Sequence, residues 1–391
     1  MLHSYKFSNF YSFAGETEIS FEVSRTLQAN GLVSENHGKL LNKSMAIIGP
    51  NGSGKTNAIK AITFIVWFIQ FSFQKQPPEE KIYYKSHFFN ENKPSNFEAE
   101  FDVGGTLWRY ELSITNTKVL REALYKKKSR TFSYVFIREL NKKTNQYSVK
   151  QQGFGFPKKE AEKTRKNCSL ISAGAQYGVA LASMLTSAFV NTNVTVIGRD
   201  HFANHKVFEA AKYFSEHIDI QTQAKKLLKN WDLGLKDIEF VKYNDPNDEQ
   251  EKTIPFGVHS SNNSTSRLNF LQESSGTQSA FILLFLLLPV LKAGGIAIVD
   301  ELESDLHPHM LKPILELFAS QATNPGNAQI LFTTHSIEIL NLLHKSQILL
   351  VEKDENCSSQ IWRLDSVKGV RIDDNLYAKY MAGAYSAVPE V

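Results

Sequence analysis

The residues with the clearest chemical potential form a glycine-rich run at positions 49–56, which fits the phosphate-binding pattern G-x-x-x-x-G-K-[ST]. Glycines let backbone N–H groups fold around phosphate oxygens at a helix N-terminus. Lys55 supplies a positive charge to the terminal phosphates, and the Thr56 hydroxyl can bind Mg²⁺. The alternative is a glycine-rich turn with a chance lysine, but such a turn would have to match the four fixed positions of the motif and both flanking elements by coincidence. The candidate nucleotide-binding residues of this run are Gly49, Pro50, Asn51, Gly52, Ser53, Gly54, Lys55, Thr56 and Asn57.

Two acids, Asp300 and Glu301, directly follow the apolar run 296–299. An apolar strand that ends in two carboxylates can hold Mg²⁺ through one acid and orient water through the next. Because successive strand residues point to opposite sides, the two acids are expected to have different roles. We predict that Asp300 binds the metal, directly or through water, and that Glu301 is the base or the water-positioning residue. The alternative is a strand that simply ends in acids.

Three further motifs lie next to predicted strands or helices. Ser275, Gly276, Thr277 and Gln278 stand before a long apolar stretch, where free N–H groups at a helix N-terminus can bind phosphate, although Ser-Gly is most often only a cap. His335 follows the apolar run 329–333, at the strand edge where ligands of open α/β sheets bind. We therefore predict that His335 contacts the γ-phosphate or the attacking water. Residues 304–308 form a turn before a helix, which indicates either a subunit contact or a plain N-cap.

The elements that must position these motifs alternate along the chain, and we predict an α/β fold. The N-terminal segment reads as a β-hairpin around Gly15, and 96–115 as a second hairpin that turns at Gly104 and Gly105. Residues 156–235 favour helices, whereas the polar stretch 243–266 favours a loop or boundary. The remaining predicted elements are strands at 44–48, 295–299, 329–333 and 348–352 and helices at 56–73, 208–217, 220–231, 278–291 and 308–320.

The composition of the chain excludes several classes of protein. The 391 residues exceed a typical single domain, and 42% hydrophobic with 21% charged residues exclude disordered, collagenous and coiled-coil chains. Two cysteines, Cys168 and Cys357, cannot form a disulfide framework or a Cys-based zinc site, and the N-terminus lacks a signal-peptide pattern, so we expect a cytoplasmic protein. The apolar runs 61–73 and 280–291 are too short to span a bilayer and read as buried core helices, so no membrane partner is expected.

Charge is concentrated in one segment. Residues 118–166 carry 15 Lys/Arg and 4 Asp/Glu, a local charge of +11 in a chain whose net charge is +4. Such a run is most often a solvated face, but it also suits contact with a phosphate backbone or an acidic partner.

Together these motifs resemble the Walker A, signature, Walker B, D-loop and switch-histidine set of ABC-type ATPases. The N-terminal hairpin, the Ser-Ser-Gly-Thr-Gln form of the signature and the run Leu306-His307-Pro308 resemble the SMC/RecF-like clan. Within it, the tail Y-x-x-G-x-Y at 380–385, followed by Val388-Pro389, resembles the RloA-like and OLD-family-related group, which includes AriA-like phage-defence ATPases. The likeness covers about 1–140 and 265–391.

The resemblance implies an ATPase head in two lobes, 1–140 and 265–391, separated by an inserted basic and mostly helical subdomain at 141–264. It implies a homodimer or higher homo-oligomer in which ATP lies between the Walker loop of one head and the Ser275-Gly276 turn of the other. A water oriented by Glu301 would attack the γ-phosphate in line, while Lys55, Mg²⁺ and His335 offset the developing charge. Two positions depart from the family pattern: Thr277 replaces the second glycine of the signature, and Ser336 follows the histidine where an aspartate is common. The nearest candidate region for the Q-loop is 87–90.

Three functions remain open on the sequence. The first is a sensor or scaffold of an antiphage, abortive-infection-type system that controls a separately encoded effector, a TOPRIM-type nuclease, because no nuclease domain follows the ATPase segments. The second is a DNA-binding ATPase of repair or maintenance, supported by the basic segment. The third is a nucleotide-dependent assembly protein with negligible turnover. A further expected partner is DNA or a phage protein.

Overall fold

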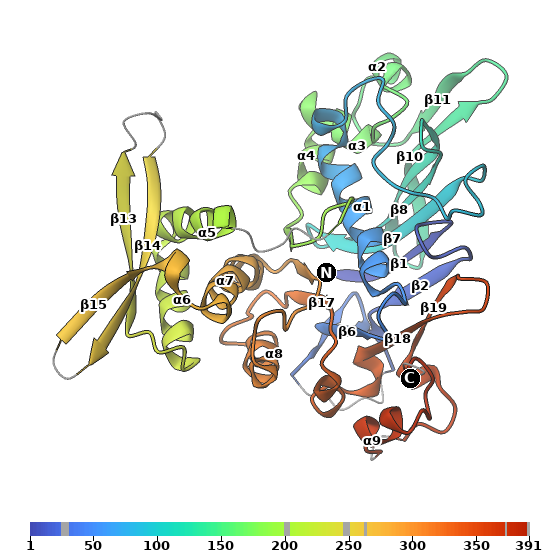
Figure 1. The fold of residues 1–391 in the computed structure, drawn as a ribbon. Helices are drawn as coiled ribbons and strands as arrows, with labels where there is room; N and C mark the ends of the chain where they lie inside the picture. Colours follow the sequence, from blue (N-terminus) through green and yellow to red (C-terminus); the bar gives the residue numbers. More distant parts are fainter. Residues whose placement is uncertain (25–30, 199–203, 245–250, 262–263, 372–373, 389–391) are drawn as a thin grey trace.

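A computed structural model describes residues 1–24, 31–198, 204–244, 251–261, 264–371 and 374–388. Two sheets form the body of the molecule, and a smaller unit projects from it as an arm (Figure 1). The predicted α/β class is confirmed. The helices are α1 Lys55–Lys75, α2 Lys158–Lys163, α3 Leu170–Gln176, α4 Ala180–Thr186, α5 Asn204–Glu216, α6 Ile218–Asn230, α7 Ser275–Ala293, α8 Leu311–Ala319 and α9 Leu376–Met381.

The central sheet has the strand order β12-β16-β17-β6-β18-β19, and all neighbours are parallel except β18 and β19. Apart from the short edge strand β12, its parallel strands are mainly buried apolar runs, as expected for a sheet covered on both faces. Met45 and Ile47 of β6 face one hydrophobic core and Ala46 and Ile48 face the other, so the sheet divides the two cores. The strands are β6 Ser44–Ile48, β12 Val190–Thr192, β16 Ile296–Val299, β17 Gln329–Thr333, β18 Ile348–Lys353 and β19 Ser359–Arg363.

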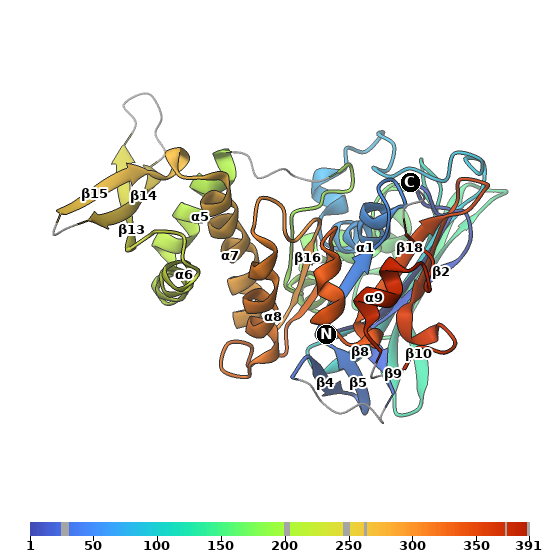
Figure 2. The same ribbon diagram turned by 60° about the horizontal axis from the view of Figure 1, so that its bottom comes forward.

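Helix α1 packs in the first core and α7 and α8 pack in the second, on opposite faces of the central sheet (Figure 2). Among the described residues, α1 and α7 are the two helices long and apolar enough to cross a membrane, yet most of each is buried inside the fold. Both predicted core helices are therefore confirmed as buried, but the prediction that they are too short to span a bilayer is wrong, because each helix extends beyond its apolar run. Helix α7 ends at Gly294, whose φ of 77° is the left-handed conformation typical of a helix C-cap.

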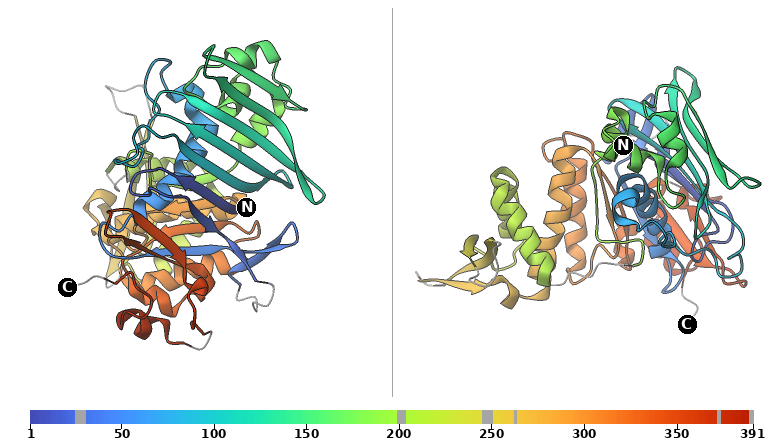
Figure 3. Two further views of the ribbon diagram at one scale, coloured as in Figure 1. Left: turned by 90° about the vertical axis from the view of Figure 1, so that its right-hand side faces the viewer. Right: turned by 90° about the horizontal axis from the view of Figure 1, so that it is seen from above.

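The second large sheet is antiparallel and has the order β11-β10-β9-β8-β7-β1-β2. One face covers α1, and the other is turned toward the viewer in the left panel of Figure 3. Both predicted hairpins are present: β1 pairs with β2, and β7 joins β8 through Gly104 and Gly105, which have φ of 62° and 67°. The strands are β1 Leu2–Ser8, β2 Thr17–Ser20, β7 Ser95–Val103, β8 Thr106–Ile114, β9 Val119–Lys128, β10 Thr131–Asn141 and β11 Gln146–Gln151; a small sheet adds β3 Glu22–Val23, β4 Val33–Asn36 and β5 Lys39–Asn42.

The arm combines α5 and α6 with an antiparallel sheet of β13 Asp237–Asn244, β14 Glu251–Ser261 and β15 Ser264–Asn269. Its helices match the predicted ones. The prediction of a loop at 243–266 is wrong for the described residues, because β14 and β15 pair there; 245–250 and 262–263 lie outside the described residues. Exposed residues of β15 are mainly Ser and Thr, so the hydrophobic alternation that signals a half-buried strand is missing.

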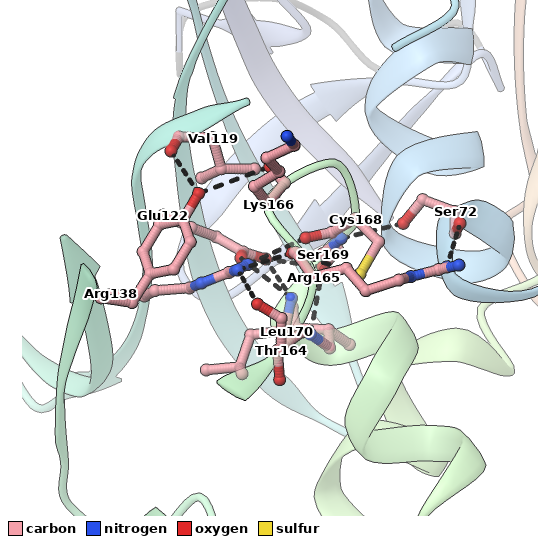
Figure 4. Close-up of polar contacts among 12 residues, drawn as sticks. Ser72, Val119, Glu122, Arg138, Thr164, Arg165, Lys166, Cys168, Ser169 and Leu170 are labelled. Atoms are coloured by element: carbon pink, nitrogen blue, oxygen red, sulfur yellow. Dashed lines mark hydrogen bonds and ion pairs between the residues drawn. The ribbon is translucent and has the colours of Figure 1, made fainter. Parts of the chain in front are cut away.

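A buried ion pair ties the antiparallel sheet to the far end of α1 (Figure 4). Glu122 of β9 and Arg138 of β10 are both fully buried, 3.5 Å apart. Glu122 accepts hydrogen bonds from the Leu170 N–H at the start of α3 and from the Ser169 hydroxyl. Arg138 donates to the carbonyls of Thr164, Arg165 and Cys168. The pair therefore holds residues 164–170 in place, and the Ser169 N–H in turn donates to Ser72 of α1.

Replacing Arg138 by Leu is expected to lower the free energy of unfolding by about 3–5 kcal/mol, because it strands a buried carboxylate and three carbonyls. Urea unfolding followed by circular dichroism measures this loss. Arg121→Leu is the matched control. Arg121 lies on the same sheet but pairs with Glu111 at a partly exposed position, where an ion pair contributes about 0–1 kcal/mol to the free energy of unfolding. Equal losses for the two variants would contradict the role given to burial.

Candidate functional site

The glycine-rich loop links the end of β6 to the start of α1, and two of its glycines have no room for a side chain. Gly54 has a φ of 114°, and a Cβ there would lie 2.4 Å from the Ser359 hydroxyl. A Cβ on Gly49 would lie 2.1 Å from the carbonyl oxygen of Val351. The loop is thus pressed against β18 and β19, and only glycine permits this approach.

Lys55 is the first residue of α1 and is 7% exposed. Its ammonium donates to the carbonyls of Gly49 at 2.8 Å and Pro50 at 3.1 Å, so the side chain folds back along its own loop. Burial lowers the pKa of Lys55, while the nearby carboxylates of Asp300, Glu301 and Glu303 act in the opposite direction. The positive charge therefore lies in a partly desolvated position, where an anionic ligand interacts with it more strongly than in water.

Asp300 follows β16 and is 3% exposed. Its carboxylate oxygens lie 3.0 and 3.1 Å from the Thr56 hydroxyl and 2.6 Å from the Thr333 hydroxyl, which donates to one of them. A carboxylate and a hydroxyl oxygen side by side fit Mg²⁺, which usually takes few protein ligands and completes its shell with water and phosphate oxygens. Within the described ranges, no group of three His, Cys, Asp or Glu side chains could hold a metal without such help.

Glu301 adopts the left-handed conformation with a φ of 49°, a strained state for a residue with a side chain. Its N–H donates to the Thr333 hydroxyl at 2.8 Å. A carboxylate oxygen lies 3.5 Å from Nε2 of His335, and both side chains are about two-fifths exposed, at 38% and 43%. The His335 N–H donates to Glu303, so a second acid holds the histidine loop. Glu301 and His335 can therefore reach one water molecule from two sides.

These groups surround one cleft of about 370 Å³. Residues from three predicted motifs meet there, although more than 240 positions separate the glycine loop from the acids. Of the predicted residues of the glycine loop, Gly49, Pro50 and Ser53 do not line the cleft. The lining residues are Asn51, Gly52, Gly54, Lys55, Thr56, Asn57, Asp300, Glu301, Thr333 and His335.

The predicted signature turn lies outside this cleft, at the N-terminus of α7. The Ser274 hydroxyl accepts from the Thr277 N–H, and Gln278 donates from its side chain to the carbonyls of Leu271 and Glu273. Thr277 is buried, whereas Ser275 is exposed. Thr277 and Gln278 therefore shape the turn, and Ser275 with Gly276 forms its outward part.

Residues 304–306, which resemble a D-loop, connect the acids to the predicted signature turn within the same chain. The Ser304 N–H donates to the Glu301 carbonyl, and Asp305 has a φ of 59°. A Cβ on Gly276 would lie 2.9 Å from the Asp305 carbonyl oxygen, so the two turns touch. His307 accepts from the His309 N–H, which makes it the N-cap of the short helix that precedes α8.

The arm sheet is attached to the signature turn through Glu273. One Glu273 oxygen lies 2.8 Å from Nε2 of His259 on β14, and a Cβ on Gly257 would lie 2.1 Å from the same oxygen. The hydrogen bond to Glu273 raises the pKa of His259. The strand, the acid and the turn are thus in direct contact.

Four supporting residues were not predicted. The Ser359 hydroxyl donates to the Ser53 carbonyl at 2.6 Å and accepts from the Ser12 hydroxyl at 2.7 Å, and Ser12 in turn accepts from the Asn57 side chain. Thr333 bonds Asp300 and Glu301, and Asn193 bonds the backbone of Asp300. Ser12, Asn193 and Ser359 stand in no recognisable motif, so no signal in the sequence marked them. Thr333 ends the apolar run before His335, but its hydrogen bonds to the two acids were not predicted. Residues 87–90, the nearest Q-loop candidate, do not line the cleft.

The tail singled out in the sequence packs beside β18. Tyr380 of α9 is buried and donates its hydroxyl to the Ala387 carbonyl at 2.6 Å, and the Ala387 N–H donates to Glu352. Pro389 lies outside the described residues.

The family model described as "AAA domain, putative AbiEii toxin, Type IV TA system" matches residues 44–341, more than half of the chain. No curated protein matches the chain in sequence. Solved structures that match include the Smc head domain with an extended coiled coil bound to the C-terminal domain of ScpA, from Pyrococcus furiosus. The identity is 10%, the match covers 93% of this chain and 97% of that chain, and the TM-score is 0.43, too low to carry weight for function.

Proposed function

We propose, from the premise that this chain belongs to the AAA-domain family described as "putative AbiEii toxin, Type IV TA system", that it binds MgATP in the cleft around Lys55 and hydrolyses it. The observation that carries the proposal is the meeting of three groups at one place: the glycine loop, the Asp300–Thr56 pair and the Glu301–His335 pair. Mg²⁺ held by Thr56 and Asp300 would supply charge neutralisation at the phosphates. Lys55 binds phosphate charge, and Glu301 takes or orients the proton of the attacking water.

We also propose that two copies share each nucleotide. Among the described residues, those that line the cleft include none from the signature turn, while Ser275 is exposed and Gly276 is partly exposed at the N-terminus of α7. A second copy that turns this helix end toward the cleft would complete the ring of N–H donors. This arrangement makes hydrolysis dependent on assembly.

A mixing experiment tests this sharing. Lys55→Ala and Ser275→Arg chains are each expected to hydrolyse little ATP alone, because every site in either homodimer has one damaged part. In a mixed dimer one site combines the intact cleft of one chain with the intact turn of the other, so activity should reappear on mixing. Mixtures that stay as inactive as their components, although the chains co-purify, would contradict a shared site. Lys55→Ala mixed with itself is the control.

For the biological role, we propose a sensor or scaffold of an antiphage defence system that holds and releases a separate toxic effector, a TOPRIM-type nuclease. Support comes from the family description, which names a toxin of a type IV toxin–antitoxin system, and from the motif resemblance to RloA-like and AriA-like ATPases. The test is co-expression with the neighbouring genes under phage challenge. Protection that requires both Lys55 and the neighbour supports the proposal, whereas toxicity of the chain alone would make it the effector itself.

DNA binding in repair or maintenance is the second candidate, and one surface favours it. Lys126, Lys127, Lys128 and Arg130 gather at the turn between β9 and β10, and within the described part of the chain none has a carboxylate within ion-pair distance. Lys127 lies 5.7 Å from the ring centroid of Phe132, as suits contact with nucleic acid. The other basic residues of 118–166 are partly committed elsewhere, as the buried Arg138 illustrates.

Neutralising Lys126, Lys127 and Lys128 to Gln should remove salt-dependent DNA affinity if this second function holds. Lys142, Lys143 and Lys150 serve as a matched control set, because the first two lie at the opposite end of β10. That strand of 11 residues is about 35 Å long at about 3.3 Å per residue. Affinity lost equally from both sets would indicate non-specific charge attraction, and no affinity in the parent chain would exclude this function.

A further inference from the structure

Asn193 stands directly after β12 and bonds both backbone groups of Asp300. Its side-chain nitrogen donates to the Asp300 carbonyl at 3.0 Å, and the Asp300 N–H donates to its side-chain oxygen at 2.8 Å. Because one partner can only accept and the other can only donate, the orientation of the amide is fixed. Asn193 is 3% exposed, so water does not compete for these bonds.

The bonds lie where the regular sheet stops. β12 pairs with β16 as far as Thr192 and Ile298, and β16 ends at Val299. The peptide groups of Asp300 would be buried without strand partners, a costly state for N–H and C=O groups. Asn193 supplies both missing partners through its side chain and so extends the pairing by one residue.

The other side of Asp300 is held by β17, where Thr333 donates to the Asp300 carboxylate at 2.6 Å. With its backbone fixed from β12 and its carboxylate fixed from β17, Asp300 has one orientation, which faces Thr56 at 3.0 Å. A carboxylate that is restrained before metal binding loses less conformational freedom on binding.

We propose that Asn193 is a positioning residue for the Mg²⁺-binding aspartate: it holds the backbone of Asp300 so that the carboxylate meets the metal together with Thr56. This inference rests on the proposed function, because it assumes that MgATP occupies the cleft. Partners that orient a metal ligand from outside typically contribute about 10- to 100-fold in metal affinity or activity.

Asn193 also begins a segment that touches the other parts of the site. The Val196 carbonyl accepts from the Tyr11 hydroxyl at 2.7 Å, and the Ile197 carbonyl accepts from Lys60 of α1 at 3.2 Å. The segment 193–198 therefore joins the Asp300 strand, the helix of the glycine loop and the N-terminal hairpin. These hydrogen bonds restrain the segment and therefore the position of Asn193 beside Asp300.

The test measures ATP affinity with and without Mg²⁺, using a fluorescent ATP analogue and the full chain. Asn193→Ala should require about 10-fold more Mg²⁺ for half of the Mg²⁺-dependent gain in affinity, while affinity without Mg²⁺ stays at the parental value. Asn191→Ala is the matched control. Asn191 lies on the same strand, but its side chain donates to the carbonyls of Phe285 and Leu286 of α7, so its Mg²⁺ requirement should not change.

The outcomes are distinguishable. A parent chain without any Mg²⁺-dependent gain would overturn the proposed function itself. A parent chain with this gain and an Asn193→Ala variant with the same Mg²⁺ requirement would overturn the positioning role alone. If Asn193→Ala loses its thermal transition, the isosteric Asn193→Asp decides. It keeps the acceptor for the Asp300 N–H but not the donor for its carbonyl, and a parental Mg²⁺ requirement would again reject the proposal.

Discussion

Glu301→Gln is expected to bind MgATP with parental affinity and to hydrolyse it about 100-fold more slowly or worse. An amide cannot accept the proton of the attacking water, and general-base assistance is worth about 10²–10⁴-fold. The side chain keeps its size, so phosphate binding by Lys55 and the glycine loop should not change. Phosphate release under saturating ATP measures the loss. Because the nucleotide then persists, the variant should also elute as a dimer of the 44.2 kDa chain in the presence of MgATP.

Glu303→Gln is the matched control for Glu301. Its side chain lies two residues further on and can still accept the His335 N–H as an amide. We expect a much smaller loss of turnover there. Hydrolysis by Glu301→Gln at the parental rate would show that another group activates the water.

Lys55→Ala should weaken ATP binding by about 10- to 100-fold, because charge-assisted hydrogen bonds are worth about 1.5–3 kcal/mol each. Turnover should fall with affinity, since the same charge acts on the phosphates in the transition state. The loop also loses the bonds from Lys55 to the carbonyls of Gly49 and Pro50, so a thermal melt without nucleotide should accompany the titration.

Lys55→Arg separates charge from shape. Arginine keeps the charge, but its planar fork does not fit a site in which the lysine is 7% exposed, so binding should recover only in part. If Lys55→Ala binds ATP as tightly as the parent chain, the loop at 49–56 does not hold phosphate.

The elements that carry short-range signals were predictable. The apolar strands before Gly49 and Asp300 and the apolar helix after Gln278 are continuous in sequence, and the structure places them as β6, β16 and α7. The hairpin turn at Gly104 and Gly105 follows from the need for positive φ. Motif spacing with strand and helix order was enough to place Lys55, Asp300 and His335 at one edge of the sheet.

What escaped prediction depends on contacts between distant, chemically ordinary residues. Asn193 meets Asp300 across 107 positions, and Ser359 meets Ser12 across 347 positions. Asparagine and serine occur in every loop, so their types carry no signal until the fold brings them together. β12 has three residues, too few for a period, and β15 is too polar and exposed to display alternation.

The link between the arm and the signature turn has a mechanical consequence. Glu273 fills the space over Gly257 and bonds His259, so a displacement of β14 would act directly on the residues that precede Ser275. The arm extends well clear of the body in the right panel of Figure 3, so its outer end is accessible to a partner molecule. If two copies share each nucleotide as proposed, a partner molecule bound to the outer end of the arm would change how Ser275 of one copy meets the ATP of the other, and would thereby control hydrolysis.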